Sequence, residues 1–246
     1  MKEVQAMTLA LRTPGCLPVL VWGPPGVGKT QRIRQIGEKL FGPDRVLTLI
    51  ASIYDPTDFS GIPVPRGGRL ERYPDAWVSQ AMNWVDGGLI LFDEVSCAPP
   101  AVQAALLRIM LERVVGSVKL PDAVKIVAAA NPTDQAAGGW ELSAPLANRF
   151  VHQTWGCPSV GEWVDWLLSV PGDDDNPNWS KAKALGAAFV RSHPAVLCED
   201  LTKVTGREPP AYATPRSWES ALRLLAQCMK ENAMEVYPGL AQGVLG

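Results

Sequence analysis

Residues 23–30 form a short run whose composition and spacing suit the binding of phosphate groups. The run reads GPPGVGKT and fits the pattern G-x-x-x-x-G-K-[ST] at Gly23, Pro24, Pro25, Gly26, Val27, Gly28, Lys29 and Thr30. Its glycines let backbone N–H groups turn inward around phosphates at the start of a helix. Lys29 would reach the β- and γ-phosphates of a nucleotide, and Thr30 would offer its hydroxyl to Mg²⁺. The alternative is a glycine-rich turn with an incidental lysine, which the complete pattern disfavours.

Two adjacent carboxylates, Asp93 and Glu94, supply groups that nucleotide chemistry needs beside such a loop. They follow the apolar run LILF at 89–92, so we expect them at the carboxyl end of a buried strand, where parallel sheets bind ligands. Asp93 would hold the magnesium, directly or through water. Glu94 would polarise an attacking water, which an ATPase needs and a metabolite kinase must avoid. Without the phosphate loop, the same pair would indicate only a solvated strand end.

Arg149 stands in the stretch PLANRF at 145–150, between a predicted short helix and a predicted strand. No acidic residue lies within three positions on either side of it. The sequence therefore predicts that its guanidinium meets a negative charge from elsewhere. The alternative left open is that Arg149 caps the helix or pairs locally within its own subunit.

The elements that must position these residues alternate between strands and helices up to about residue 156. Near-continuous apolar runs of strand length are typical of a parallel sheet buried on both faces. Four such runs are expected, at 18–22, 45–50, 88–92 and 124–130, and RFVHQTW at 149–155 would supply a fifth strand. Helical patterns lie between them, notably at 30–40 and 100–112. Residues 1–156 are therefore predicted to form an α/β nucleotide-binding domain.

Two insertions and a change of pattern complete the predicted organisation. Residues 62–74 and 112–122 are each predicted to form a β-hairpin, turning at Gly67-Gly68 and near Gly116-Ser117. From residue 157 onward only helical patterns occur, joined by polar segments rich in proline. Residues 157–246 are therefore predicted to form a small all-α domain. Because the sequence stops soon after the last helical pattern, we expect either an abbreviated domain or part of a longer protein.

Composition limits the classes of function. The chain has 246 residues, of which 47% are hydrophobic and 20% charged, with a net charge of −2. This balance gives no basic field for nucleic acid or for an anionic membrane. The five cysteines form no CxxC pair and there are two histidines, so a zinc site is disfavoured and reduced thiols are expected. With no signal peptide and no apolar run long enough for a bilayer, we expect a cytoplasmic protein.

Several motifs in order resemble those of the AAA+ ATPases, and within them the MoxR group. Besides the phosphate loop and the carboxylate pair, AAANP at 128–132 resembles the segment with the sensor 1 asparagine, here Asn131. PLANRF resembles the segment that carries the arginine finger, and TPRSWESAL at 214–222 resembles the helix that carries the sensor 2 arginine, here Arg216. The resemblance runs from Val19 to about Lys230.

The resemblance implies a P-loop core with a five-stranded parallel sheet and a helical lid, binding ATP or ADP with Mg²⁺. It implies catalytic roles for Glu94, Asn131, Arg149 and Arg216, with Thr30 and Asp93 at the metal. Asn131 would orient the water and contact the γ-phosphate without adding a charge. Arg149 would meet the γ-phosphate held by a neighbouring subunit of a ring, which the family suggests is a hexamer. Arg216, whose positive charge is poorly placed in the first turn of a helix, would meet the nucleotide from the lid.

The two predicted hairpins resemble insertions of the MoxR branch. Arg66, Arg69 and Arg72 would face a central pore and a partner, or they would merely keep an edge hairpin soluble; the sequence leaves both open. The family resemblance suggests a partner protein, possibly one with a von Willebrand factor A domain. Ser52 is a candidate for coupling Glu94 to such a partner.

Three classes of function compete. The leading hypothesis is an ATP-hydrolysing, chaperone-like remodelling factor. A nucleotide-gated motor or loader acting on nucleic acid is the alternative, and the slightly acidic net charge disfavours it. A small-molecule phosphotransferase is the third, and Glu94 together with the Asn131, Arg149 and Arg216 set disfavours it.

Overall fold

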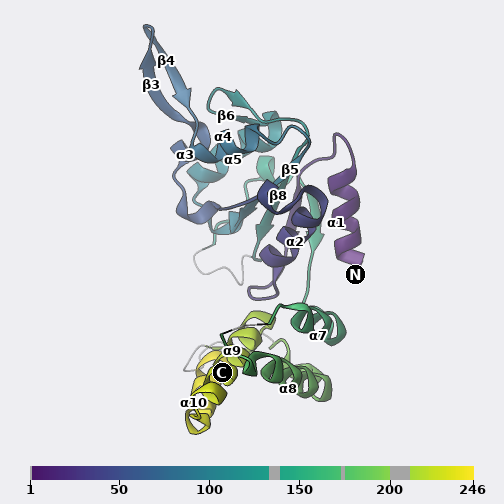
Figure 1. Ribbon diagram of the computed structural model, residues 1–246. Coiled ribbons are helices and arrows are strands. Elements are labelled where there is room, and N and C mark those ends of the chain that lie inside the picture. The colour runs from purple at the N-terminus through teal and green to yellow at the C-terminus, as the bar shows by residue number, and fades with distance from the viewer. Residues whose placement is uncertain (1, 133–138, 173–174, 200–210) are drawn as a thin grey trace. The chain divides into compact units, whose positions relative to one another are not determined.

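Five parallel strands form the sheet of the first unit in the computed structural model (Figure 1). They are β1 (Val19–Trp22), β2 (Val46–Ile50), β5 (Gly88–Asp93), β8 (Val124–Ala130) and β9 (Val151–Thr154), in the order β2-β5-β8-β1-β9. The predicted five-stranded parallel sheet is thus confirmed. The four apolar runs predicted β1, β2, β5 and β8 correctly, because strands covered by helices on both sides have few polar residues. The fifth strand, β9, has the sequence VHQT and is largely exposed.

The structure describes residues 2–132, 139–172, 175–199 and 211–246. The chain divides into two compact units, of which the first comprises Met1–Pro24 and Lys29–Trp155. The second comprises Pro25–Gly28 and Gly156–Gly246. Within the described residues, none of the helices combines the length and the apolar character that a membrane span requires.

Helices cover both faces of the sheet in the first unit. On one face, α1 (Lys2–Arg12) and α2 (Lys29–Phe41) pack against Val19, Val21 and other inward-pointing strand residues. On the other, α3 (Pro56–Ser60), α4 (Ala76–Met82) and α5 (Pro100–Glu112) pack against the alternate residues, such as Leu20. A short helix, α6 (Ala144–Ala147), precedes β9.

Single 3₁₀ turns occur in both units. Those of the first unit are Pro43–Arg45, Ala51–Ile53 and Val95–Cys97, and those of the second are Pro194–Val196 and Met234–Val236.

Both predicted hairpins are present in the first unit. The longer one pairs β3 (Ile62–Arg66) with β4 (Arg69–Tyr73) and projects away from the sheet (Figure 1). Every residue of its two strands is exposed. The shorter one pairs β6 (Val114–Val115) with β7 (Val118–Lys119).

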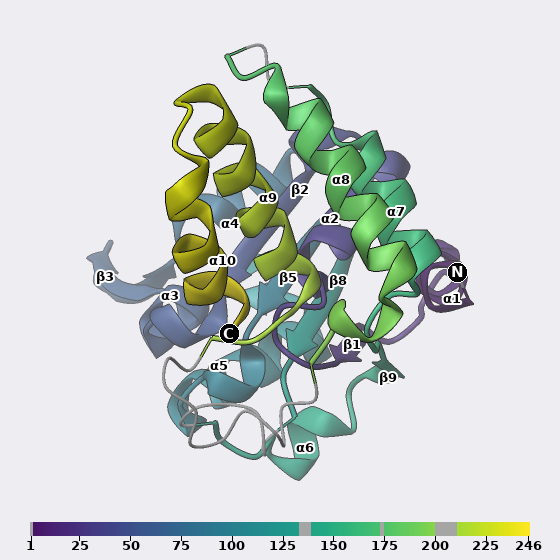
Figure 2. The same cartoon turned by 90° about the horizontal axis from the view of Figure 1, so that it is seen from below.

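The second unit is helical. Its helices are α7 (Val160–Ser169), α8 (Asn178–Ser192), α9 (Pro215–Lys230) and α10 (Tyr237–Leu245). Helix α8 packs against α7 and α9, and α10 packs against α9 (Figure 2). Tryptophans dominate its core, which holds Trp163, Trp179 and Trp218. Capping boxes start two of the helices, with Ser159 and Glu162 at α7 and Thr214 and Ser217 at α9.

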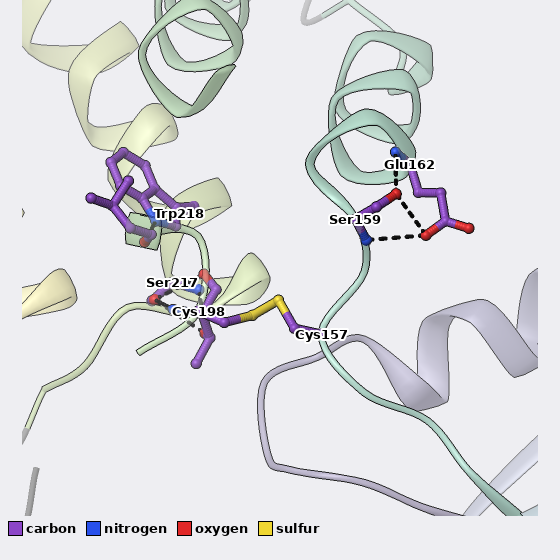
Figure 3. The surroundings of a disulfide bond; sticks show 8 residues. Cys157, Ser159, Glu162, Cys198, Ser217 and Trp218 are labelled. Atoms are coloured by element: carbon purple, nitrogen blue, oxygen red, sulfur yellow. Dashed lines mark hydrogen bonds between the residues drawn. A yellow bond between two sulfur atoms is a disulfide. The ribbon is translucent and has the colours of Figure 1, made fainter. Parts of the chain in front are cut away.

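A disulfide in the second unit corrects one expectation from the sequence. Cys157 and Cys198 are bonded, with Cα atoms 6.4 Å apart, whereas all five cysteines were expected to be reduced (Figure 3). Cys16, Cys97 and Cys228 are free. The pairing was missed because the two cysteines lie 41 positions apart in the sequence, and no local pattern marks them.

We expect the Cys157–Cys198 bond to stabilise the helical unit. Cross-linking residues 41 positions apart restricts the unfolded chain, which in the chain-entropy account is worth about 4 kcal/mol of unfolding free energy. Cys198→Ser should therefore shift the urea unfolding transition of the helical unit to lower concentration, as followed by tryptophan fluorescence. Dithiothreitol should shift the wild type in the same way and leave Cys198→Ser unchanged. Cys16→Ser, at a free cysteine of the other unit, is the control; an unchanged wild-type transition after reduction would contradict the bond.

Candidate functional site

Apart from Arg149, which precedes the first residue of β9, the predicted site residues of the first unit gather at the carboxyl edge of the sheet. Strand register sets this edge, because Trp22 pairs with Ala130 and Phe92 pairs with Ala128. The phosphate loop leaves β1, the carboxylate pair ends β5, and Asn131 follows β8 directly. Neighbouring parallel strands that end at the same edge form the place where α/β proteins bind ligands.

The loop between β1 and α2 needs glycine for two reasons, a close approach of the backbone at Gly23 and a positive φ at Gly28. A Cβ atom on Gly23 would clash with the backbone carbonyl of Trp155 in the same unit, so only glycine permits this close approach. Gly28 has a φ of 86°, in the left-handed region that other residues rarely adopt. The loop therefore turns tightly enough to aim backbone N–H groups at an anion.

Lys29, the first residue of α2, brings a buried positive charge to the loop. Its side chain is only 8% exposed. The ammonium donates hydrogen bonds to the carbonyl oxygens of Gly23 and Pro24 at 2.7 and 2.9 Å, and to Oδ1 of Asn131 at 2.7 Å. The predicted sensor asparagine and the predicted phosphate-binding lysine thus lie in direct contact.

Asn131 is held from two sides. Its Oδ1 accepts from Lys29, and its backbone N–H donates to Oγ of Ser96 at 3.2 Å. Ser96 is fully buried and belongs to the 3₁₀ turn Val95–Cys97 after β5. Sequence reasoning missed Ser96, and the only signal for it was its position two residues after Glu94.

Thr30 and Asp93 are also brought together, since the Thr30 hydroxyl donates to Oδ2 of Asp93 at 2.5 Å. A hydroxyl and a carboxylate in contact, beside a loop built for phosphates, suit Mg²⁺, which takes few protein oxygens and completes its shell with water and phosphate. Within the described residues, no group of three or more His, Cys, Asp or Glu side chains could hold a metal by itself. Thr30 and Asp93 are thus the side chains that would hold Mg²⁺.

Glu94 adopts a backbone conformation that is uncommon for its residue type. Its φ and ψ are 56° and 34°, in the left-handed region, and its N–H donates to Oδ1 of Asp93 at 2.9 Å. Such a conformation costs of order 1–3 kcal/mol and persists where the surrounding structure holds it, often at functional sites. The exposed carboxylate accepts a 2.7 Å hydrogen bond from the Ser52 hydroxyl. Ser52, the candidate for coupling Glu94, is thus its hydrogen-bond partner.

Cys97 lies in the same turn but is a poor nucleophile. Burial, followed by the negative charge of Glu94, raises the pKa of its thiol. A thiol with a raised pKa is mostly protonated at neutral pH and reacts slowly. The site therefore points to carboxylate chemistry on water rather than to cysteine chemistry.

Arg149 forms no hydrogen bond with these residues in the described part of the structure. Its backbone N–H donates to the carbonyl of Leu146 at the end of α6, and its Nε is buried without a hydrogen-bond partner among the described residues. The cap of α6 is Asn148 rather than Arg149. Local capping by its side chain, the alternative considered from the sequence, therefore finds no support.

Arg216 lies in the second unit, in the first turn of α9, and is exposed. Its backbone N–H donates to the carbonyl oxygen of Gly26 at 3.3 Å, within the same unit. Thr214, the N-cap of α9, sits so close to Gly26 that a Cβ atom there would overlap its side chain. The start of α9 and residues 25–28 of the phosphate loop are therefore in contact.

Comparison with known proteins gives one family match and several partial relatives. The family described as AAA domain (dynein-related subfamily) matches residues 18–150. Midasin of Giardia intestinalis is 29% identical over 159 residues, which is 62% of this chain and 3% of midasin. An ATP-dependent protease ATP-binding subunit-like protein of Rhodococcus erythropolis is 34% identical over 102 residues, 37% of this chain and 28% of that protein. Chaperone MoxR1 of Mycobacterium tuberculosis is 29% identical over 154 residues, 61% and 38% of the two chains.

The chain spans well under half the length of each of these relatives. Among solved structures, NtrX of Brucella abortus in complex with ATP superposes with a TM-score of 0.51 at 18% identity. The match covers 92% of this chain and 50% of NtrX. The NtrX complex with ADP gives a TM-score of 0.52, also at 18% identity, and covers 92% of this chain and 49% of NtrX. At this identity the similarity shows a common fold.

Proposed function

The chain belongs to the AAA domains of the dynein-related subfamily, a family of ATP-hydrolysing enzymes, and we propose that it is a Mg²⁺-dependent ATPase of the MoxR type that remodels a partner protein. The observation that carries this proposal is the connected set at the carboxyl edge of the sheet. There Lys29 contacts Asn131, and Thr30 contacts Asp93. Beside them, Glu94 has a backbone conformation that residues other than glycine rarely adopt, and its carboxylate accepts a hydrogen bond from Ser52.

Each residue of this set has a task that follows from its chemistry. Lys29 and the loop N–H groups bind the β- and γ-phosphates, and the Thr30 hydroxyl and Asp93 carboxylate hold the metal. When bound, Mg²⁺ neutralises charge on the phosphates. Glu94 accepts the proton of the attacking water, whose orientation the Asn131 amide fixes. Because Ser52 donates to the Glu94 carboxylate, release of this bond would free the base for water.

We further propose that Arg149 and Arg216 both contact the nucleotide. Arg149, whose Nε has no hydrogen-bond partner among the described residues, would contact the γ-phosphate held by the next subunit of a ring, by family resemblance a hexamer. Arg216 would contact the nucleotide from the helical unit of its own subunit. The contact of its backbone with Gly26 supports this role.

The hairpin of β3 and β4 is the proposed contact with the partner. Cross-strand register places Arg66 directly opposite Arg69, and two like charges in that position repel each other. The nearest compensation is Glu71, 4.0 Å from Arg66. Ile62, Val64 and Tyr73 lie exposed on the same face, because residues alternate between faces along a strand. An acidic partner segment with apolar side chains would fit this face; a protein with a von Willebrand factor A domain is the kind that the resemblance suggests.

A double substitution at the hairpin tip should separate partner capture from ATP hydrolysis. Arg66→Glu/Arg69→Glu should leave basal phosphate release unchanged, because the hairpin projects away from the site, but should abolish partner capture. Capture is measured by pull-down with two baits, the hairpin variant and a control variant, and both baits also carry Glu94→Gln so that they retain ATP. Arg191→Glu, at an exposed arginine of α8, is the matched control. Equal capture by the two baits would assign the arginines to solubility alone.

The same proposal places the protein in the cytoplasm. In that reducing compartment the Cys157–Cys198 bond would form only transiently. The redox state of these cysteines in cells, trapped by alkylation, tests this part.

The direct test of the proposed activity is phosphate release from ATP by the purified chain, with Lys29→Ala as the variant. Removing the ammonium from the phosphate cradle should weaken ATP binding and abolish turnover, and removing Mg²⁺ with EDTA should stop the wild type. ADP should form without any acceptor. A requirement for a small-molecule acceptor would indicate a phosphotransferase instead. Stimulation by DNA with a steep salt dependence would indicate a nucleic-acid motor.

A further inference from the structure

His152 connects two parts of the first unit that serve different tasks. It lies on β9, which neighbours β1 (Figure 2), and it pairs with Leu20 of β1. Its Nδ1 accepts a hydrogen bond from Nε1 of Trp22 at 2.9 Å, and the two rings are within 9° of parallel. Its Nε2 is 2.8 Å from the carbonyl oxygen of Ala147. One imidazole therefore bridges the end of β1 and the end of α6.

The two contacts define the tautomer of the ring. An indole N–H can only donate, so Nδ1 must be the unprotonated nitrogen that accepts from Trp22. Nε2 then carries the proton and donates to the Ala147 carbonyl, which is one of the C-terminal groups that α6 leaves without an intrahelical partner. Trp22 thus sets the tautomer that lets His152 hold α6.

The bridged ends adjoin functional residues. Trp22 directly precedes Gly23, the first residue of the phosphate loop, and Ala147 lies two residues before Arg149. Phe150, between Arg149 and β9, is buried and packs edge-on against the His152 ring, with centroids 6.4 Å apart. The short connection that carries Arg149 is therefore fixed on both sides by contacts to His152.

We propose that His152 is a positioning residue for Arg149, holding the end of α6 against the strand that leads into the phosphate loop. This inference rests on the proposed function, in which Arg149 stabilises charge on the γ-phosphate. The guanidinium must be placed closely, since a 1 Å displacement in such a contact can cost about 100-fold in rate. Nε of Arg149 has no hydrogen-bond partner within the described residues, so contacts that fix the neighbouring backbone contribute to the placement of the guanidinium.

Two substitutions separate the two hydrogen bonds. His152→Gln places an amide nitrogen near the position of Nε2 and can still donate to Ala147. His152→Asn places its amide near the position of Nδ1, within reach of Trp22, but is too short for Ala147. His152→Asn should lower kcat about 10-fold or more at an unchanged KM for ATP, and His152→Gln should restore most of the rate. Thermal melting checks that both variants are folded.

The decisive comparison is with Arg149→Ala. If His152 acts through Arg149, the double variant Arg149→Ala/His152→Asn should be no slower than Arg149→Ala alone. Losses that multiply, or a His152→Asn variant with wild-type kcat, would overturn the proposal. Should His152→Asn fail to fold, Trp22→Phe takes its place. It removes the hydrogen bond from Trp22 Nε1 to His152 Nδ1, and its kcat is compared with that of Arg149→Ala in the same way.

Mixing experiments distinguish this proposal from the proposed function itself. Adding Lys29→Ala subunits to His152→Asn subunits should raise the rate per intact phosphate loop, because each Lys29→Ala subunit supplies a well-placed Arg149 to its neighbour. No increase, although Arg149→Ala is rescued in the same way, would show that His152 acts on its own phosphate loop. If Arg149→Ala is not rescued either, action between subunits fails, and the double variant alone decides the role of His152.

Discussion

Arg149→Ala should lower kcat for ATP hydrolysis by about 10³–10⁵-fold. In the transition state, negative charge spreads over the γ-phosphoryl oxygens, and an arginine supplied from outside the phosphate loop stabilises it there. The affinity for ATP should change little, because Lys29 and the loop N–H groups bind the ground state. Steady-state phosphate release and a nucleotide titration measure the two quantities separately.

Arg149→Lys is the informative companion variant. Lysine keeps the positive charge but loses the planar fork that contacts two phosphate oxygens at once, so an intermediate rate is expected. Because Nε of Arg149 is buried, a substitution there also changes packing. The melting temperature and the ring assembly of both variants are therefore compared with those of the wild type, and the rates are interpreted where these agree. A loss of less than about 10-fold in kcat for assembled Arg149→Ala would assign the side chain a structural role, since an arginine finger contributes far more.

Glu94→Gln should bind ATP as well as the wild type and turn over at least about 10²-fold more slowly. The amide keeps the shape of the carboxylate and can still contact Ser52, but it cannot take a proton from water. The expected result is a stable ATP complex, detected as nucleotide that stays bound and unhydrolysed through gel filtration. Near-normal turnover would show that another group is the base.

Ser52→Ala is the matched control for Glu94→Gln. It removes the 2.7 Å hydrogen bond to the carboxylate and leaves the base itself in place. We expect turnover to persist but to respond less to a partner protein. A loss as large as that of Glu94→Gln would instead mean that Ser52 is needed for the chemical step.

The sheet and the phosphate loop could be predicted from the sequence because their signals are local. Four of the five strands are short apolar runs, and the glycine–lysine pattern fixes the loop between one strand and the next helix. The resemblance to the AAA+ ATPases and their MoxR group is confirmed by the family match and by the similarity to Chaperone MoxR1. The contact of Ser96 with Asn131 was not predictable, because it depends on which strand ends are neighbours in the sheet.

Helices α1, α3, α4 and α10 were not predicted, and α10 and α1 show the physical reasons. Helix α10 contains a proline and two glycines, which are poor helix formers, and it is stabilised by packing of Tyr237 and Leu245 on the core of the second unit. Helix α1 buries only Met7 and Leu11, so its apolar stripe is too narrow to stand out in the sequence. In both cases tertiary contacts decide the structure.

The central claim is that ATP is hydrolysed at a site completed by Arg149 of a neighbouring subunit, and mixing two inactive variants tests it most directly. Arg149→Ala and Lys29→Ala should each be inactive alone. In mixed rings, some interfaces combine an intact phosphate loop with an intact Arg149, so phosphate release should partly return and should peak at intermediate mixing ratios. If hetero-rings form, as shown by co-purification of differently tagged subunits, and no activity returns at any ratio, Arg149 does not act between subunits and the account is wrong.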